Sequence, residues 1–246
     1  MKADVVICFY KKQHLWPLVL HGLLLNKDHI GTVYVVNDER WDESVRTTMA
    51  RQINGRLTVH WLWHEHDGFG HHKSLNQGAR AVKTPYFIHM DDDIVLMEGC
   101  VKRLLEDVDD QTLVAGICHD VSPDLTIKDL EGGEKRIWRM DTRTKTELTK
   151  EMRWMAVRDC LLCCNKEAFL ALGGRDEGYK GYGFIDYDFG VRWMMKHGLD
   201  SFIIGRGVAL NICGPDQHPH MWDKPNFDRF FKKRQEWETY LANNHA

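Results

Sequence analysis

Three consecutive aspartates, Asp91, Asp92 and Asp93, lie between two apolar runs and constrain the fold more than any other stretch of this chain. The run before them, residues 86–90, predicts a short buried strand with the carboxylates at its C-terminal edge. Ligands bind at that edge in an open α/β sheet. Adjacent carboxylates repel one another unless a cation lies among them, and oxygen ligands of this kind suit Mg²⁺ or Mn²⁺. The alternative is an acidic surface turn, which the hydrophobic flanks disfavour because solvated turns usually contain Gly, Pro or Asn.

The chain before the aspartates alternates between predicted strands and predicted helices. Apolar, β-branched runs predict strands over residues 3–9, 32–36, 57–63 and 86–90. Between them lie predicted helices over residues 15–25, 41–53 and 72–82. This alternation predicts an α/β fold with a parallel sheet and helices on both faces. Since polar residues follow each predicted strand, we expect them to converge on one edge of the sheet.

The pattern is less regular beyond the aspartates. It predicts strands over residues 113–118, 159–165, 201–204 and 208–213, and helices over residues 99–105, 166–172, 185–197 and 226–241. Residues 127–129 and 136–139 are expected to pair as a hairpin, and residues 141–153 to form a loop. The chain has no internal repeat and no linker, so residues 1–246 are predicted to form one domain.

Charge and cysteine content limit the classes of function. The 246 residues carry a net charge of −3, which argues against a broadly basic nucleic-acid-binding surface. Seven cysteines without regular spacing favour a reducing compartment over a disulfide framework. No apolar run has the length of a membrane span, and no signal peptide is visible at the N-terminus. We therefore expect a cytoplasmic location.

A second informative stretch covers residues 173–193. Asp186 and Asp188 fall in the first turn of a predicted helix, where the helix dipole favours carboxylates. One interpretation is simple N-terminal capping, and the other is that one of them acts as a general base. The preceding loop is rich in glycine and tyrosine, so backbone and rings can approach a ligand closely. Acidic and aromatic residues together are what a sugar site requires.

Four stretches of the chain resemble glycosyltransferases of the GT-A fold. DVVICFYKKQHLWPLVLHGLL and VYVVNDE are similar to the first two strand regions of the large inverting family two group. HKSLNQGARAVKTPYFIHMDDDIVL resembles the segment that ends in the DxD motif of that group. CLLCCNKEAFLALGGRDEGYKGYGFIDYDFGVRW resembles the C-terminal motif of galactosyl- and polypeptide N-acetylgalactosaminyltransferases. The resemblance covers most of residues 3–193 but matches residues 101–158 poorly.

This resemblance implies an overall organisation. The expected fold is GT-A, with a Rossmann-like, mostly parallel central sheet flanked by helices and a smaller antiparallel part on the acceptor side. Residues 1–98 are expected to bind the nucleotide sugar, and residues 99–246 the acceptor.

The resemblance also implies roles for individual residues. Asp93 is expected to bind the metal, Asp91 to contact the metal or the ribose, and Asp186 to act as the catalytic base. The other residues expected to bind the nucleotide sugar are Phe9, Tyr10, Asp38, Lys73, Asn76 and Asp92. The residues expected to bind the acceptor are Asp176, Glu177, Tyr182, Gly183 and Asp188.

The chain departs from the family pattern at two places. Ile185 stands before the expected base, where the family usually has an acidic residue. The first strand ends in Cys8, Phe9, Tyr10 and Lys11, where the family has a run resembling Pro-Thr-Tyr-Asn. These departures concern acceptor orientation and base recognition rather than the fold.

Histidines provide candidates for further metal ligands. The family often has a late histidine as a third ligand, and His218 and His220 lie in a suitable loop. We expect His220 to be the ligand, and the alternative is that both are solvated. A separate zinc site is a weaker interpretation, because its candidate histidines lack a convincing partner set. Those candidates are His64, His66, His71 and His72.

The predicted activity is transfer of a sugar from a nucleotide sugar, most simply a UDP-sugar, to an acceptor hydroxyl with inversion, assisted by Mn²⁺ or Mg²⁺. The acceptor stays open between a glycan, a protein, a lipid and a nucleic acid. One alternative is a phage- or virus-type enzyme that glycosylates modified DNA bases. Two others are a sugar-phosphate nucleotidyltransferase and a non-catalytic sugar-binding module. The segment after the first strand lacks the Gly-rich loop of a nucleotidyltransferase.

Overall fold

The computed structural model describes residues 1–64, 70–143, 148–158, 160–214 and 224–244. Its first four strands are β1 (Ala3–Phe9), β2 (Ile30–Asn37), β3 (Thr58–Trp63) and β4 (Tyr86–Asp91). They lie in the order β3-β2-β1-β4 and are all parallel. The carboxyl ends of these strands therefore meet at one edge of the sheet, as the alternation of the sequence predicts.

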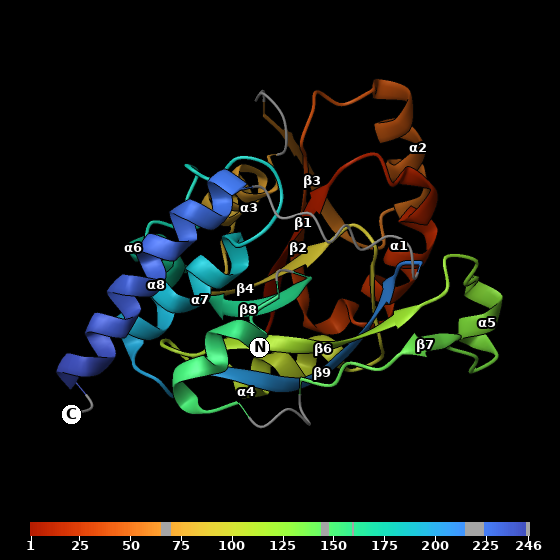
Figure 1. Ribbon diagram of the computed structural model, residues 1–246. Helices are drawn as coiled ribbons and strands as arrows, with labels where there is room; N and C mark the ends of the chain where they lie inside the picture. Colours follow the sequence, from red (N-terminus) through yellow and green to blue (C-terminus); the bar gives the residue numbers. More distant parts are fainter. Residues whose placement is uncertain (65–69, 144–147, 159, 215–223, 245–246) are drawn as a thin grey trace.

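The sheet continues with strands of mixed direction (Figure 1). These strands are β5 (Ile94–Leu96), β6 (Leu113–Val121), β7 (Ile137–Arg139), β8 (Leu161–Asn165) and β9 (Phe202–Ile212). Strand β8 is antiparallel to both β4 and β6, whereas β9 is parallel to β6. Strands β5 and β7 are antiparallel to β9 and β6. The predicted combination of a parallel part and a smaller antiparallel part is confirmed.

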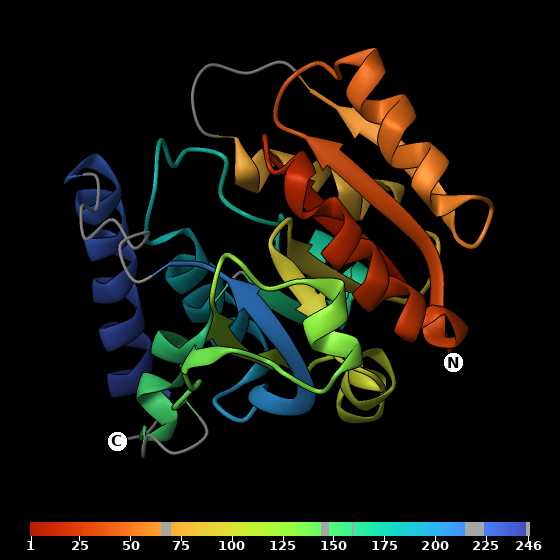
Figure 2. The same ribbon diagram turned by 90° about the vertical axis from the view of Figure 1, so that its right-hand side faces the viewer.

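Helices cover both faces of the sheet, which gives three layers (Figures 1 and 2). One face carries α1 (Trp16–Leu25), α2 (Glu43–Ile53) and α4 (Cys100–Asp107). The other carries α3 (His71–Ala81), α6 (Lys166–Ala171) and α7 (Ile185–His197), with α8 (Lys224–Asn244) packed on α7. Short helices are α5 (Ile127–Glu131) and the 3₁₀ turns η1 (Gln13–Leu15), η2 (Lys27–His29) and η3 (Lys150–Ala156). Among the described residues, no helix combines the length and apolar character needed to cross a membrane.

Strand β1 lies at the centre of the core. Every residue of β1 is buried, and its side chains alternate between the two helical layers. Helix α3 approaches this strand closely at Gly78, where an added Cβ would lie 2.3 Å from Val6 Cγ1. Close packing of α3 on β1 fixes the residues at the N-terminus of α3 over the carboxyl edge of the sheet.

Three sequence-based expectations are wrong in the second half of the chain. Residues 127–131 form helix α5 rather than one arm of a hairpin, because Thr126 and Asp129 make a capping box. The expected loop over residues 141–153 includes most of the 3₁₀ turn η3. Residues 201–213, expected as two strands, form the single strand β9, whose Gly205 and Gly207 allow close packing on Val114 of β6 and Leu104 of α4.

Candidate active site

The ends of β1 and β4 meet around the three aspartates. The Tyr10 backbone N–H donates a 2.7 Å hydrogen bond to Asp92 Oδ2. The Lys12 ammonium lies 2.6 Å from Asp93 Oδ2 and 3.3 Å from Asp92 Oδ1. A cation of the protein itself therefore occupies a position among the carboxylates, as electrostatics requires for adjacent acids.

Protonation equilibria in this cluster are strongly shifted. Burial raises the pKa of Asp92 to about 7, although Lys12 opposes the shift. Burial also raises the pKa of Asp93, again against the influence of Lys12. These two carboxyl groups lie in a site that disfavours their ionised forms, and a cation placed beside them would favour those forms.

Asp91 lies under the start of α3 and has different neighbours. His71 Nε2 is 2.8 Å from Asp91 Oδ1, and His89 Nε2 is 3.8 Å from the same oxygen. Although burial opposes ionisation, the positive charge of His71 holds the pKa of Asp91 well below its usual range. Asp91 is therefore an anion even before any ligand binds.

Asp38, at the end of β2, is bound to the segment that leads into α3. Its carboxylate accepts hydrogen bonds from the Gly70 N–H at 3.0 Å and from Ser74 Oγ at 2.6 Å. His64 Nε2 lies 2.8 Å from the same Ser74 hydroxyl. The structure thus brings the ends of β2 and β3 together with α3, as the sequence predicts.

Two other residues expected at the nucleotide site lie at the end of β1. Phe9 is buried and stacks on Trp41, with ring centroids 5.2 Å apart. Tyr10 is 47% exposed and lies at the open edge. Of this pair, Tyr10 is accessible from solvent, whereas Phe9 supports the edge from within.

Helix α3 carries Lys73 and Asn76. Lys73 is partly exposed on the first turn of the helix. The Asn76 amide donates to the Arg175 carbonyl and to Glu177 Oε1, and its oxygen accepts from the Arg175 N–H. These three bonds give Asn76 and Glu177 a structural role in holding the loop before α7. Their predicted contacts with ligands stay predictions.

Some of the residues expected to bind the acceptor are exposed, and others are bound to arginine side chains of the protein. Tyr182 is half exposed, and Gly183 has a φ of 97°, in the region that favours glycine. Asp176 is held in a two-bond contact with the Arg229 guanidinium, which fastens the loop to α8. Asp188 is fully buried and accepts a 2.6 Å hydrogen bond from Arg192. Its burial also raises its pKa.

Asp186 lies in the first turn of α7 and is partly exposed. Its Oδ1 accepts a 3.0 Å hydrogen bond from the Tyr187 N–H. Burial and the charge of Asp186 raise the pKa of Tyr187, and the nearby Arg158 guanidinium partly offsets this rise. Arg158 is therefore close enough to Tyr187, the residue after the expected base, to influence its ionisation.

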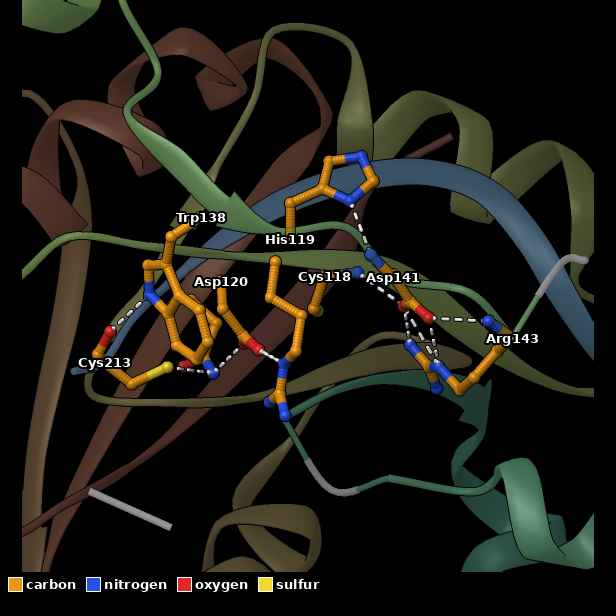
Figure 3. Close-up of polar contacts among 9 residues, drawn as sticks. Cys118, His119, Asp120, Trp138, Asp141, Arg143 and Cys213 are labelled. Carbon is orange, nitrogen blue, oxygen red and sulfur yellow. Dashed lines mark hydrogen bonds and ion pairs between the residues drawn. The ribbon is translucent and has the colours of Figure 1, made fainter. Parts of the chain in front are cut away.

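A cavity of about 190 Å³ lies among β6, the end of β7 with the residues that follow it, and Arg158. Its lining residues are Cys118, Asp120, Arg139, Met140, Asp141, Thr142 and Arg158. Arg139 Nε donates to Asp120 Oδ2, and Asn211 Nδ2 donates to Asp120 Oδ1 at 2.8 Å. Behind the cavity, the buried Arg143 guanidinium donates to Asp141 Oδ2 at 2.6 Å (Figure 3).

Two residues that line this cavity have different neighbours: Asp120 on the side of the aspartates and Arg158 on the side of α7. Ile94, next to Asp93, pairs with Asn211 of β9, which binds Asp120. Asp120 and Arg158 line the same cavity, and Arg158 acts on the residue after Asp186. The sequence did not single out Lys12, Asp120 or Arg158, because their partners lie far away in the chain.

The predicted third metal ligand is not placed. His220 and its alternative His218 lie outside the described residues. Within the described part, hard oxygen donors that suit Mn²⁺ or Mg²⁺ are supplied by Asp91, Asp92 and Asp93.

Comparison with protein families gives one match over most of the chain. Residues 4–161 match the model described as glycosyl transferase family 2. No curated protein sequence matches the chain.

Solved structures share the fold at low sequence identity. GalNAc-T7 with UDP, GalNAc and Mn²⁺ has a TM-score of 0.69 at 12% identity, covering 97% of this chain and 49% of that chain. TarS residues 1–349 of S. aureus with UDP-GlcNAc has a TM-score of 0.69 at 13% identity, covering 100% of this chain and 68% of that chain. The mannosyltransferase PcManGT from Pyrobaculum calidifontis with GDP-Man and Mn²⁺ has a TM-score of 0.61 at 14% identity, covering 98% of this chain and 74% of that chain. The chain thus has a GT-A-like fold and spans about half the length of GalNAc-T7.

Proposed function

Since the chain belongs to glycosyl transferase family 2, we propose that it transfers a sugar from a UDP-sugar to an acceptor hydroxyl with inversion. The observation that carries the proposal is the Lys12 ammonium among the carboxylates of Asp92 and Asp93, at the carboxyl edge of the parallel strands. This is an acidic edge that requires a cation. UDP as the nucleotide is supported by the similar structures that hold UDP or UDP-GlcNAc, while a similar mannosyltransferase holds GDP-Man.

The carboxylates of Asp91 and Asp93 would hold the divalent cation, with Asp92 beside them. Hard oxygen donors fit Mn²⁺ or Mg²⁺, and the ammonium of Lys12 already stands in for a cation at two of the three residues. When bound, such an ion offsets the negative charge of the leaving diphosphate. His220 stays the proposed additional ligand.

Residues at the strand ends would bind the nucleoside. Asp38 is fixed by Gly70 and Ser74, so its orientation is set before a ligand arrives. Tyr10 is exposed at the same edge, and Lys73 lies on the first turn of α3 above it. Fixed polar groups and one exposed ring suit a nucleoside and its phosphates.

Asp186 would act as the general base that takes the proton of the acceptor hydroxyl. The hydroxyl oxygen then attacks the anomeric carbon from the face opposite the leaving diphosphate. The cavity lined by Asp120 and Arg158 would receive the acceptor, with Tyr182 at the exposed loop before α7.

A donor screen tests the proposal. Release of nucleoside diphosphate is measured for each nucleotide sugar with and without Mn²⁺, and the anomer of the product is determined by NMR. We expect release from a UDP-sugar that depends on the metal, and an inverted product. No release from any donor would support the non-catalytic sugar-binding alternative, and a salt-sensitive gel shift with modified DNA would support a nucleic-acid acceptor.

Asp186→Asn separates catalysis from binding. General-base catalysis contributes about 10² to 10⁴-fold, so turnover should fall at least about a hundredfold, with donor affinity within a few-fold of wild type. Asp188→Asn is the informative comparison, because Asp188 is buried against Arg192. That variant should lower the melting temperature and leave turnover of the folded fraction nearly unchanged. Normal turnover by Asp186→Asn would mean that another residue is the base.

A further inference from the structure

A cluster of sulfur, nitrogen and oxygen donors lies directly beneath the start of α3. Cys8 of β1 is the register partner of Asp91 in the neighbouring strand β4. His89 lies two residues before Asp91, so both side chains are on the same face of the sheet. His71 is the first residue of α3, which covers that face. Four donor residues from three elements are thus brought together.

No hydrogen bond among the described residues explains why the polar side chain of His89 is buried. It is 2% exposed, and within the described part of the chain neither of its ring nitrogens has a hydrogen-bond partner. A buried polar group without a partner costs about 1–3 kcal/mol, and native proteins seldom retain one without a role. Its Nε2 lies 3.8 Å from Asp91 Oδ1, beyond hydrogen-bond distance, and its ring centroid is 5.2 Å from that of His71.

The distances suit a small metal ion. One ligand atom each of Cys8, His71 and His89 lies within 4.8 Å of the others. Tetrahedral zinc, with Zn–S bonds of about 2.3 Å and Zn–N bonds of about 2.0 Å, separates such atoms by roughly 3.5 Å. Small side-chain rotations would therefore close the site. Asp91 Oδ1 lies beside this group, 2.8 Å from His71 Nε2, but does not belong to it, so the fourth position is left to water.

We propose that Cys8, His71 and His89 bind a thiophilic divalent ion of the Zn²⁺ class, with Asp91 beside it. Thiolate and imidazole donors prefer such an ion, whereas the carboxylates of Asp92 and Asp93 prefer Mn²⁺ or Mg²⁺. The ion enters past His71 and Asp91, whose side chains are 18% and 30% exposed. Binding releases two protons to the buffer, one from the Cys8 thiol and one from the imidazolium of His71, whose pKa, although burial opposes the shift, the neighbouring Asp91 raises. The occupied site fixes the position of Asp91 from behind the proposed sugar-nucleotide site.

Co²⁺ is the probe, because its visible spectrum reports both geometry and a bound thiolate. Metal-free protein is titrated with Co²⁺ and then with Zn²⁺. We expect one Co²⁺ per chain, the intense d–d bands of a tetrahedral site, a thiolate-to-metal charge-transfer band, and loss of all bands when Zn²⁺ displaces Co²⁺. Binding without a charge-transfer band, or no binding in the wild-type chain, would overturn the proposal.

Variants assign the ligands. Cys8→Ser should remove the charge-transfer band, and His89→Gln should weaken Zn²⁺ binding at least about a hundredfold. Cys160→Ser, a half-buried cysteine outside the cluster, should keep both. Asp93→Asn should keep Zn²⁺ binding even if it loses Mn²⁺-dependent UDP binding, so the two sites can fail separately. A charge-transfer band that survives in folded Cys8→Ser, as judged by circular dichroism, would refute the assignment.

Discussion

At the scale of single residues, the side chain that defines the candidate site is Lys12. Its ammonium bridges Asp92 and Asp93, whose pKa values are raised by burial. A metal ion at these carboxylates must displace the ammonium or share the oxygens with it. Lys12 would therefore compete with the proposed metal ion before the donor arrives.

Replacing Lys12 with Met should strengthen metal binding. The variant keeps the length of the side chain but removes its charge, so Mn²⁺ no longer competes with an ammonium. Lys12 is partly exposed, and solvent screening limits the effect to about 1 kcal/mol, or roughly a fivefold lower Kd for Mn²⁺ by calorimetry. Lys11→Met is the matched control, since Lys11 pairs with the exposed Glu39. Weaker Mn²⁺ binding by Lys12→Met would contradict this competition.

Individual roles were harder to predict than positions. The sequence placed Asp91 and Asp38 correctly at strand ends, because each follows an apolar run. It could not reveal that Asn76, Asp176 and Asp188 are engaged by Arg175, Arg229 and Arg192. Such pairs form between residues that the folded chain brings together or that share a buried helix turn, and a motif shows only one member.

At the scale of elements, periodic hydrophobic runs predicted the parallel strands and their helices well. The consecutive strands β1, β2 and β3 lie side by side, as consecutive elements usually do, whereas β4 returns to the other side of β1. The prediction failed where local chemistry overrides hydrophobicity, as at the capping box of α5. It also failed where a buried polar network sets the path of the chain. In that network, Arg143 bonds to Asp141 and to the carbonyls of Gly116 and Ala156, so it fastens the segment after β7 to β6.

Asp141→Asn should loosen this segment. The substitution leaves the buried Arg143 without its charge partner, which costs about 3 kcal/mol in the free energy of unfolding at pH 7. Although burial opposes it, the hydrogen bond and charge of Arg143 lower the pKa of Asp141 to about 2. The stabilisation by the carboxylate is therefore complete above pH 4 and lost as the pH falls through about 2.

Urea denaturation at several pH values measures the free energy of unfolding of wild type and of Asp141→Asn. The difference between the two free energies should be constant between pH 7 and pH 5 and become smaller below pH 4. Asp200→Asn is the control, because the side chain of Asp200 is 68% exposed and its ion pairs with Lys150 and Arg153 are on the surface. A difference between wild type and Asp141→Asn that does not change down to pH 2 would mean that the ion pair is not its origin.

At the scale of the whole molecule, the proposed donor site joins parts that are distant in the sequence. Lys12, Asp38 and Asp93 come from the loop after β1, the end of β2 and the turn after β4. The strand after Asp93 pairs with β9, and the Asp93 carbonyl accepts a hydrogen bond from the Ile212 N–H. A ligand at this site would therefore contact residues of the first half of the chain, next to a strand that pairs with β9 of the second half. Its binding should stabilise the fold globally rather than one loop.

UDP and Mn²⁺ together should raise the melting temperature of the wild-type chain. A ligand at a hundred times its Kd stabilises the native state by about 2.7 kcal/mol. For a chain of this size, 1 kcal/mol shifts the melting temperature by about 2–4 °C, so the expected rise is roughly 5–10 °C. Either ligand alone should give less, because the diphosphate and the carboxylates repel each other without the cation.

In Asp93→Asn, which lacks one charge and one oxygen ligand, the rise in melting temperature should disappear, while the melting temperature without ligands changes little. Asp228→Asn, an exposed acid paired with Lys224 on α8, should keep the full rise. If Asp93→Asn kept it too, UDP and Mn²⁺ would bind without Asp93, and the proposed metal site would have to move elsewhere.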